Sequence, residues 1–225
     1  MLLTLRRMRT LPCAMLLAVQ LLGVLLYPFM EGAEVGRALF SLFGLVVLAL
    51  AVVAVRSTPA LTWVSITIGL PVVALTVLEV VYPDSSPIAL WSGVFHALFY
   101  FYTSYGLIAY MFADNWVTRD ELFATGAAFT VAAWGFAYVY GVVQIIWPGS
   151  FTAALNPDAP RTWMELLYLS FTTLTSVGLS DITPILPNAR SFVMIEQVSG
   201  VMYVALVVAR LVGLTVARAA AGSDR

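Results

Sequence analysis

The chain has 225 residues, of which 61% are hydrophobic and only 10% are charged. With a mean hydropathy of +0.95, this composition lies far from that of soluble domains and indicates a membrane protein. The formal net charge is −1 and all 11 basic residues are arginine, which excludes lysine-based covalent chemistry, and no basic stripe suited to nucleic acid is present.

Apolar segments long enough to cross a bilayer follow one another along most of the chain. A spanning helix needs about 20 mostly apolar residues, and we expect six spans, at roughly 11–30, 36–55, 60–82, 87–112, 122–147 and 190–216. The first span follows a cluster of arginines, as a signal peptide would. Its apolar run is long, however, and Glu31–Glu34 is a poor cleavage site, so we predict a retained span.

The arginines predict the orientation of these spans. Eight of them fall on the side of the N-terminus and three on the other side, so the positive-inside rule places both termini in the cytoplasm. The first group is Arg6, Arg7, Arg9, Arg56, Arg119, Arg210, Arg218 and Arg225, and the second is Arg37, Arg161 and Arg190.

The fourth expected span, from Leu90 to Phe112, contains no arginine. Without charged side chains the membrane field has little to act on, so we do not expect this span to sense voltage. His96 lies in it among aromatic residues. We expect a hydrogen-bonded interior histidine there rather than a pH sensor. The charged loop Asp114–Glu121 then divides the chain, and Asp120 is a candidate cap for the next helix.

The most informative segment is 172–184, Thr-Thr-Leu-Thr-Ser-Val-Gly-Leu-Ser-Asp-Ile-Thr-Pro. A shorter apolar piece, 162–175, leads into it, and the sixth span follows it. Small, hydroxyl-bearing and glycine residues cannot form a lipid-facing helix at this place. Irregular backbone at membrane depth occurs only where it is buried in protein or lines a water-filled path.

Residues 164–184, Met-Glu-Leu-Leu-Tyr-Leu-Ser-Phe-Thr-Thr-Leu-Thr-Ser-Val-Gly-Leu-Ser-Asp-Ile-Thr-Pro, resemble the pore helix and filter of bacterial six-span members of the tetrameric potassium channel superfamily. The residues from Arg190 to Leu214 resemble their inner helix. The resemblance implies an all-α membrane protein with six transmembrane helices, a re-entrant pore helix and filter loop, and a homotetrameric pore in the bacterial inner membrane. It divides the chain into a four-helix domain (1–113), a pore domain (121–216) and a short cytoplasmic tail (217–225).

The resemblance also assigns the filter, whose backbone carbonyls would replace the hydration shell of K⁺. Its residues would be Thr175, Ser176, Val177, Gly178, Leu179 and Ser180. Ser176 takes the place of the filter threonine, whereas Leu179 and Ser180 replace the usual tyrosine and second glycine. That last position needs a positive φ in such filters, so we expect strain at Ser180. Potassium-selective, weakly selective and poorly conducting filters all stay open.

Residues around the filter receive supporting roles. Tyr168 is the expected hydrogen-bond partner of Asp181, which lies just beyond the filter. Glu196 is a carboxyl group at membrane depth, and we expect hydroxyls of the pore helix, such as Thr172 or Thr173, to hold it. Glu165 would complement the positive start of the pore helix.

The sixth span carries the expected gating residues. Gly200 is either a hinge or a site of close helix packing. One apolar face of this helix would either line the inner cavity, where it could gate by dewetting, or contact lipid. It consists of Val201, Val204, Val208 and Val212.

We therefore expect a passive cation channel, not an enzyme, since no nucleophile–base pair, metal-ligand cluster or phosphate loop stands out. K⁺ or another monovalent cation would be the permeant ion, with no other cofactor. The partners would be further copies of the chain and the bilayer, with no nucleic acid. The alternatives are a weakly selective channel and a non-conducting scaffold or accessory subunit.

Overall fold

The computed structural model describes residues 11–30, 34–56, 62–113 and 118–223, and nearly all of them are helical. Each predicted span is a helix whose ends lie within a few residues of the expected ones, except that the last helix continues to Ser223. Arg6, Arg7, Arg9 and Arg225, which contribute to the predicted orientation, lie outside the described residues. The elements are α2 (Pro12–Met30), α3 (Glu34–Arg56), α4 (Thr62–Val81), α5 (Ser86–Met111), α6 (Arg119–Ile146), β1 (Phe151–Thr152), α7 (Trp163–Leu174), β2 (Thr183–Pro184) and α8 (Pro187–Ser223).

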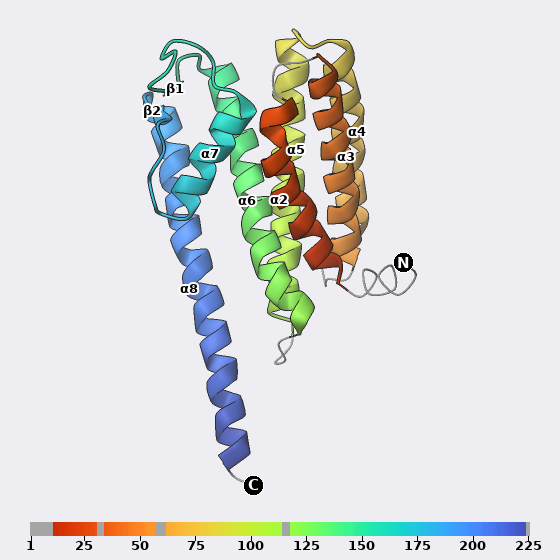
Figure 1. Cartoon of the computed structure of the whole chain (residues 1–225), viewed down its shortest axis with the longest axis vertical. Helices are drawn as coiled ribbons and strands as arrows, with labels where there is room; N and C mark the ends of the chain where they lie inside the picture. The colour runs from red at the N-terminus through yellow and green to blue at the C-terminus, as the bar shows by residue number, and fades with distance from the viewer. Residues whose placement is uncertain (1–10, 31–33, 57–61, 114–117, 224–225) are drawn as a thin grey trace.

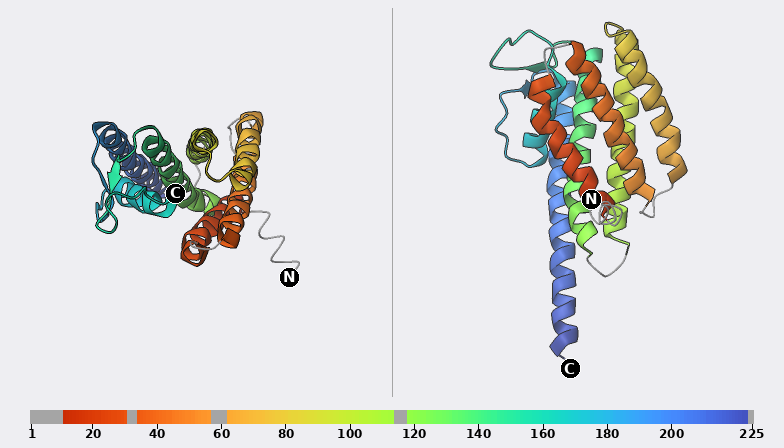
Figure 2. Two further views of the ribbon diagram at one scale, coloured as in Figure 1. Left: turned by 90° about the horizontal axis from the view of Figure 1, so that it is seen from above. Right: turned by 45° about the vertical axis from the view of Figure 1, so that its right-hand side comes forward.

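The helices form two groups joined through α6. Helices α2 to α5 lie side by side, and α6 packs against both α5 and α2 (Figures 1 and 2). On its other side α6 carries α7 and α8. The C-terminal part of α8 extends well beyond the other helices (Figure 1). The second group, α6 to α8, contains every candidate site residue.

Among the described residues, four helices are long and apolar enough to cross a membrane: α2, α4, α6 and α8. For α2 the apolar stretch is Pro12–Phe29 and for α8 it is Pro187–Leu214, while α3 contributes a shorter one, Phe43–Ala54. These helices indicate a multi-pass membrane protein, and six crossings stay a prediction.

The start of α6 differs from the sequence prediction. Helix α6 begins at Arg119, and its N-cap is Thr118, whose hydroxyl accepts a hydrogen bond from the Glu121 amide at 3.2 Å. Asp120 was therefore the wrong choice of cap. Its carboxylate instead accepts a hydrogen bond from the backbone amide of buried Cys13 at 3.2 Å, which joins α2 to α6.

A capping box starts α7, as helix entry from a loop favours. The Thr162 hydroxyl accepts from the Glu165 amide at 3.3 Å, and the Glu165 carboxylate accepts from the Thr162 amide at 2.6 Å. Arg161, which is buried, forms an ion pair with Glu165 at 3.3 Å. The expectation that Glu165 complements the start of this helix is confirmed.

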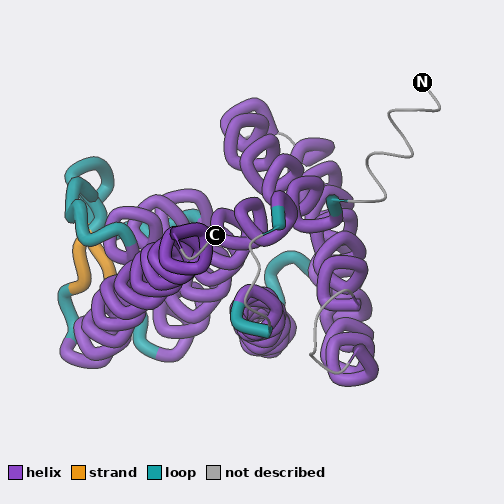
Figure 3. The backbone as a smooth tube through the Cα atoms, turned by 90° about the horizontal axis from the view of Figure 1, so that it is seen from below, coloured by secondary structure: helices purple, strands orange, loops and turns teal. Residues whose placement is uncertain are grey.

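The chain enters and leaves the α7 region at the same end of the bundle. Strand β1 precedes α7, β2 follows the segment after it, and the two strands pair antiparallel. The Ile185 amide adds a hydrogen bond to the Ser150 carbonyl at 2.8 Å. Figure 3 shows this small sheet at the outer edge of a molecule that is otherwise helical. Residues 153–182 therefore form one excursion that returns to its starting level.

Aromatic side chains of α5 and α6 fill the contact between these two helices. Tyr100 packs edge-on against Trp134, with ring centroids 5.8 Å apart, and both are almost fully buried. His96 stacks on Tyr138 at 4.3 Å, and its Nδ1 donates to the Ser92 carbonyl at 2.9 Å. An interior, hydrogen-bonded histidine was the expectation, and it is confirmed.

Candidate functional site

The candidate site begins where α7 ends. Leu174 is the last helical residue, and the chain then folds back over the end of the helix. The Ser176 amide donates to the Thr173 carbonyl and the Gly178 amide donates to the Thr172 carbonyl, both at 3.0 Å. Two of the last carbonyls of α7, which have no partner within the helix, are satisfied in this way.

The backbone after α7 takes positive φ at two positions, Ser176 (60°) and Gly178 (68°). Glycine adopts this conformation freely, whereas for serine it costs on the order of 1 kcal/mol. The expected strain at Ser180 was placed wrongly, because Ser180 has no positive φ. Its hydroxyl instead accepts a hydrogen bond from the Ile182 amide at 3.1 Å, which stabilises the turn into β2.

Residues 175–182, between α7 and β2, form the return segment, and two of its large apolar side chains are uncovered in the single chain. Val177 is 59% exposed and Leu179 is 74% exposed. Thr175, Ser176 and Gly178 are exposed as well. Apolar side chains that are exposed in a membrane protein contact lipid or another protein chain. The backbone carbonyls of residues 175–180 and the Ser176 hydroxyl are the hard oxygen donors that the segment offers to a cation such as K⁺.

Tyr168 contacts this segment at a different place from the one predicted. Its hydroxyl donates to the Leu179 carbonyl at 2.5 Å, so the expected bond to Asp181 is not formed. Asp181 is exposed beyond that point. The Tyr168 hydroxyl therefore reaches the backbone of the return segment rather than the side chain of Asp181. The polar link between α7 and the return segment therefore ends on a carbonyl of the candidate filter.

Glu196 of α8 is completely buried. Its carboxylate accepts hydrogen bonds from the hydroxyls of Ser170 in α7 and Tyr140 in α6. The Ser170 hydroxyl also lies 2.8 Å from the Ala133 carbonyl of α6. This cluster joins all three helices of the group, and each oxygen of the carboxylate has a partner, as a buried polar group requires.

The donors to Glu196 correct the prediction from sequence. Thr172 was one expected donor, but its hydroxyl donates to the Leu169 carbonyl within α7 at 2.9 Å. Ser170 occupies the side of α7 that faces α6 and α8. Tyr140 was missed altogether because nothing in the sequence showed which face of α6 meets α8. The only signal was Glu196 itself, which needs donors in an apolar helix.

Gly200 lies where α8 meets the end of α7. A Cβ atom at this position would lie 2.1 Å from the Leu174 carbonyl oxygen, closer than atoms approach. Close packing therefore explains this glycine, and a hinge role is left as a proposal.

The four valines predicted to form one face of α8 are each about half exposed. The exposed fractions are 57% for Val201, 50% for Val204, 52% for Val208 and 56% for Val212. Their spacing places them on one side of the helix. The described part of the chain does not cover this side of α8.

Residues 129–217 match a protein family described as an ion channel. The match begins within α6, includes all of α7 and the return segment, and ends within α8. No curated protein and no solved structure matches the chain. The matched segment, together with the apolar helices, supports a membrane ion channel, which implies transport rather than catalysis.

Proposed function

We propose that the protein is a passive cation channel of potassium-channel type, in which four copies bring residues 175–180 to a common axis. The observation that carries this proposal is the return segment itself. It follows the C-terminal end of a short helix, its residues 175–179 are exposed, and it lies inside the part of the chain that matches an ion channel. In this proposal α7 is the pore helix, the excursion is re-entrant, and α8 is the inner helix.

The orientation of α7 favours a cation at this site. A helix carries partial negative charge at its C-terminal end, and here that end, at Leu174, leads directly into the proposed filter. The Ser176 hydroxyl would form a ring at one mouth of the filter. The carbonyls of Thr175, Val177 and Gly178 would serve as ligands for K⁺.

A homotetramer would cover the apolar surface that one chain leaves open. Val177 and Leu179 would pack against neighbouring copies. The valine face of α8 would line the inner cavity, where an apolar constriction can stop ion flow by dewetting. Gly200 would keep α8 against the pore helix, and bending at this residue is a proposed gating motion. The bilayer and further copies of the chain are the proposed partners, without nucleic acid.

The first four helices are not proposed to sense voltage, because α5 contains no arginine. The location is proposed to be the bacterial inner membrane, with both termini in the cytoplasm. K⁺ is the proposed permeant ion, and no other cofactor is needed.

Weakly selective cation conduction is the second candidate, and one hydrogen bond and one backbone conformation favour it. The Leu179 carbonyl already accepts a hydrogen bond from Tyr168, which turns part of its lone-pair density away from an ion. The positive φ of Ser176 also leaves the inner filter site with a different backbone from one built on threonine. A non-conducting scaffold that keeps the pore fold is the candidate from another functional class.

Two glycines provide a matched test. Gly178 and Gly149 both have positive φ, 68° and 79°, and a Cβ atom would find no atom within 4 Å at either position. Alanine therefore fits sterically at both sites but strains the backbone by on the order of 1 kcal/mol. Only Gly178 lies in the proposed filter.

The experiment is K⁺ flux into liposomes that contain the purified oligomer. Wild type and Gly149→Ala should conduct, and Gly178→Ala should lose about 90% of the flux, since strain in four subunits acts on one filter. A confirmed tetramer that passes no cations would leave the scaffold as the function. Equal flux in all three proteins would remove Gly178 from the conduction path.

A further inference from the structure

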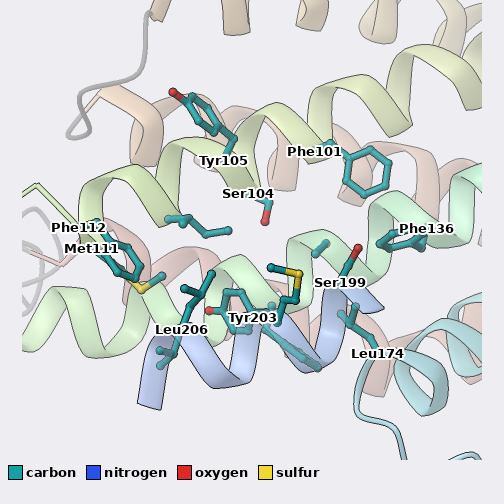
Figure 4. Close-up of a pocket in the computed structure, with 15 residues that line it drawn as sticks. Phe101, Ser104, Tyr105, Met111, Phe112, Phe136, Leu174, Ser199, Tyr203 and Leu206 are labelled. Carbon is teal, nitrogen blue, oxygen red and sulfur yellow. The ribbon is translucent and has the colours of Figure 1, made fainter. Parts of the chain in front are cut away.

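A crevice of about 420 Å³ lies between α5 and α8, above the surface of α6 to which both helices are packed (Figure 4). Its size is that of a small-molecule binding site. The proposed conduction path does not include it. Its walls come from four helices and include Phe101, Tyr105, Phe136, Leu174, Met202 and Leu206.

The hydroxyls inside the crevice are already engaged. Those of Ser104, Ser199 and Tyr203 each donate to a backbone carbonyl, at 3.1, 2.8 and 2.5 Å. The hydroxyl of Tyr105, the other tyrosine of the lining, points away from the crevice (Figure 4). No charged side chain lines it. A polar ligand would lose its water here without gaining partners, so the chemistry of the walls favours an aliphatic chain.

The crevice faces away from the valine face of α8. Its residues on this helix are Ser199, Met202, Tyr203, Leu206 and Val207. At 3.6 residues per turn they lie on the side roughly 180° from the face that contains Val201 and Val208. If the valine face looks toward a central axis, the crevice opens toward the bilayer.

One end of the crevice continues into a small hollow that contains opposite charges. Phe112 and Val207 line both, and Glu121 and Arg210 line the hollow. A guanidinium nitrogen of Arg210 lies 3.7 Å from Glu121 Oε2, and the guanidinium lies 5.0 Å from the centre of the Phe112 ring.

The buried Glu121 carboxylate is only 5% exposed, and its Oε2 atom accepts no hydrogen bond. Glu121 and Arg210 are the two charged side chains among the described residues that line the hollow, and their formal charges cancel. A headgroup that itself carries one positive and one negative charge complements this pair. Since Glu121 belongs to the first turn of the spanning helix α6, it lies at the depth where headgroups begin.

We propose that the crevice binds one phospholipid with a zwitterionic headgroup, whose acyl chain runs from Phe112 to Leu174. The phosphate would lie toward Arg210, and an amine of the headgroup would donate to Glu121. Because Leu174 is the last residue of α7 and its carbonyl contacts Gly200, the end of the acyl chain reaches the residues that position the return segment. This binding does not depend on whether the protein conducts ions.

The test is native mass spectrometry of the purified protein after addition of phosphatidylethanolamine or anionic phosphatidylglycerol. Ala132→Phe and Ser199→Phe each place a ring inside the crevice, the first from α6 and the second from an exposed position on α8. Leu70→Phe is the control, since Leu70 is 68% exposed on α4, away from the crevice.

Wild type and Leu70→Phe should retain one tightly bound phosphatidylethanolamine per chain, with at least threefold preference over phosphatidylglycerol. Ala132→Phe and Ser199→Phe should each retain at least tenfold less phosphatidylethanolamine than wild type. The comparison of the two headgroups uses wild type alone, so it does not depend on whether a variant folds. Unchanged retention in a folded filling variant would overturn the proposal, as would preference for the anionic lipid. Tyr105 lines the crevice. A disulfide between the Tyr105→Cys residues of two copies would therefore overturn the proposal too, because a second chain would then cover the crevice.

Discussion

Tyr168 supplies from α7 a hydrogen bond that residue 179 cannot supply from its own side chain. Leu179 has no polar group, whereas the filters that this segment resembles usually have a tyrosine there, so its side chain cannot brace the outer part of the segment. In the structure the hydrogen bond comes from the other partner: a side chain of α7 donates to the backbone of the return segment. Backbone acceptors of this kind carry no signature in the sequence.

The Tyr168→Phe variant removes this hydrogen bond and little else, since Tyr168 is already 44% exposed. One hydrogen bond contributes about 0.5–1.5 kcal/mol. In a tetramer we expect a change in the permeability ratio of K⁺ to Na⁺ of roughly threefold to tenfold, measured by reversal potentials in planar bilayers. Tyr82→Phe, an exposed tyrosine just after α4, should leave the ratio unchanged. The same ratio in all three proteins would contradict a bracing role.

The Glu196 cluster is the second feature at this scale with a measurable consequence. In Glu196→Ala the buried Tyr140 hydroxyl loses its acceptor, while the Ser170 hydroxyl keeps the Ala133 carbonyl as its acceptor. We expect a loss of about 1–3 kcal/mol in the free energy of unfolding, which is the usual cost of a buried polar group without a partner.

Thermal unfolding in detergent measures this loss. Met194→Ala on the same helix, at a side chain that is 57% exposed, is the control and should change stability much less. If Glu196→Ala unfolds no earlier than this control, the carboxylate does not join the three helices.

Sequence reasoning reached the burial of Glu196 but not the identity of its donors. A carboxyl group in an apolar helix must be paired, whatever the fold, so that part followed from residue type alone. The choice between Thr172, Thr173 and Ser170 depends on the rotation of α7 by less than half a turn. The role of Tyr140 as a donor depends on how α6 packs against α8, and this packing cannot be predicted from a single sequence.

At the scale of elements, the contact between α7 and α8 depends on one small residue. Gly200→Ala would place a methyl group 2.1 Å from the Leu174 carbonyl oxygen, so the helices must separate. Overpacking of this kind costs about 1–3 kcal/mol. We expect lower thermal stability and reduced ion flux together.

Gly213→Ala is the matched control, because it lies on the same helix with nothing within 4 Å of an added Cβ. Alanine favours the helix there, so stability should be equal or higher and flux should be unchanged. A Gly200→Ala protein with wild-type stability would show that α8 does not pack on α7 as closely as the structure has it.

The helices were the most predictable elements, since each is an apolar run of nearly the length that a bilayer requires. Their ends were harder. Thr118 and Asp120 are both common N-cap residues, and only the structure shows that Asp120 is engaged with Cys13 instead. Strands β1 and β2 are two residues each, too short for any alternating pattern, so no sequence argument could have found the pairing that closes the excursion.

At the scale of the whole molecule, the exposed surfaces of the single chain are the main clue to its assembly. Val177, Leu179 and the valine face of α8 lie in the group α6–α8, which matches an ion channel, while their apolar side chains contact nothing in the described part of the chain that would bury them. The sequence predicted these residues as a filter and a pore lining. It could not supply the backbone conformation of the proposed filter, because the positive φ at Ser176 follows from the way the chain folds back over the end of α7.

The central claim is that residues 175–180 of several copies together conduct cations. The most direct measurement is the reversal potential of currents from the purified oligomer in a planar bilayer, first across a concentration gradient of KCl and then with KCl on one side and NaCl on the other. The proposed function predicts a reversal potential that shows cation over anion permeability and K⁺ at least as permeable as Na⁺. Anion-selective currents, or no currents from a confirmed oligomer, would contradict it.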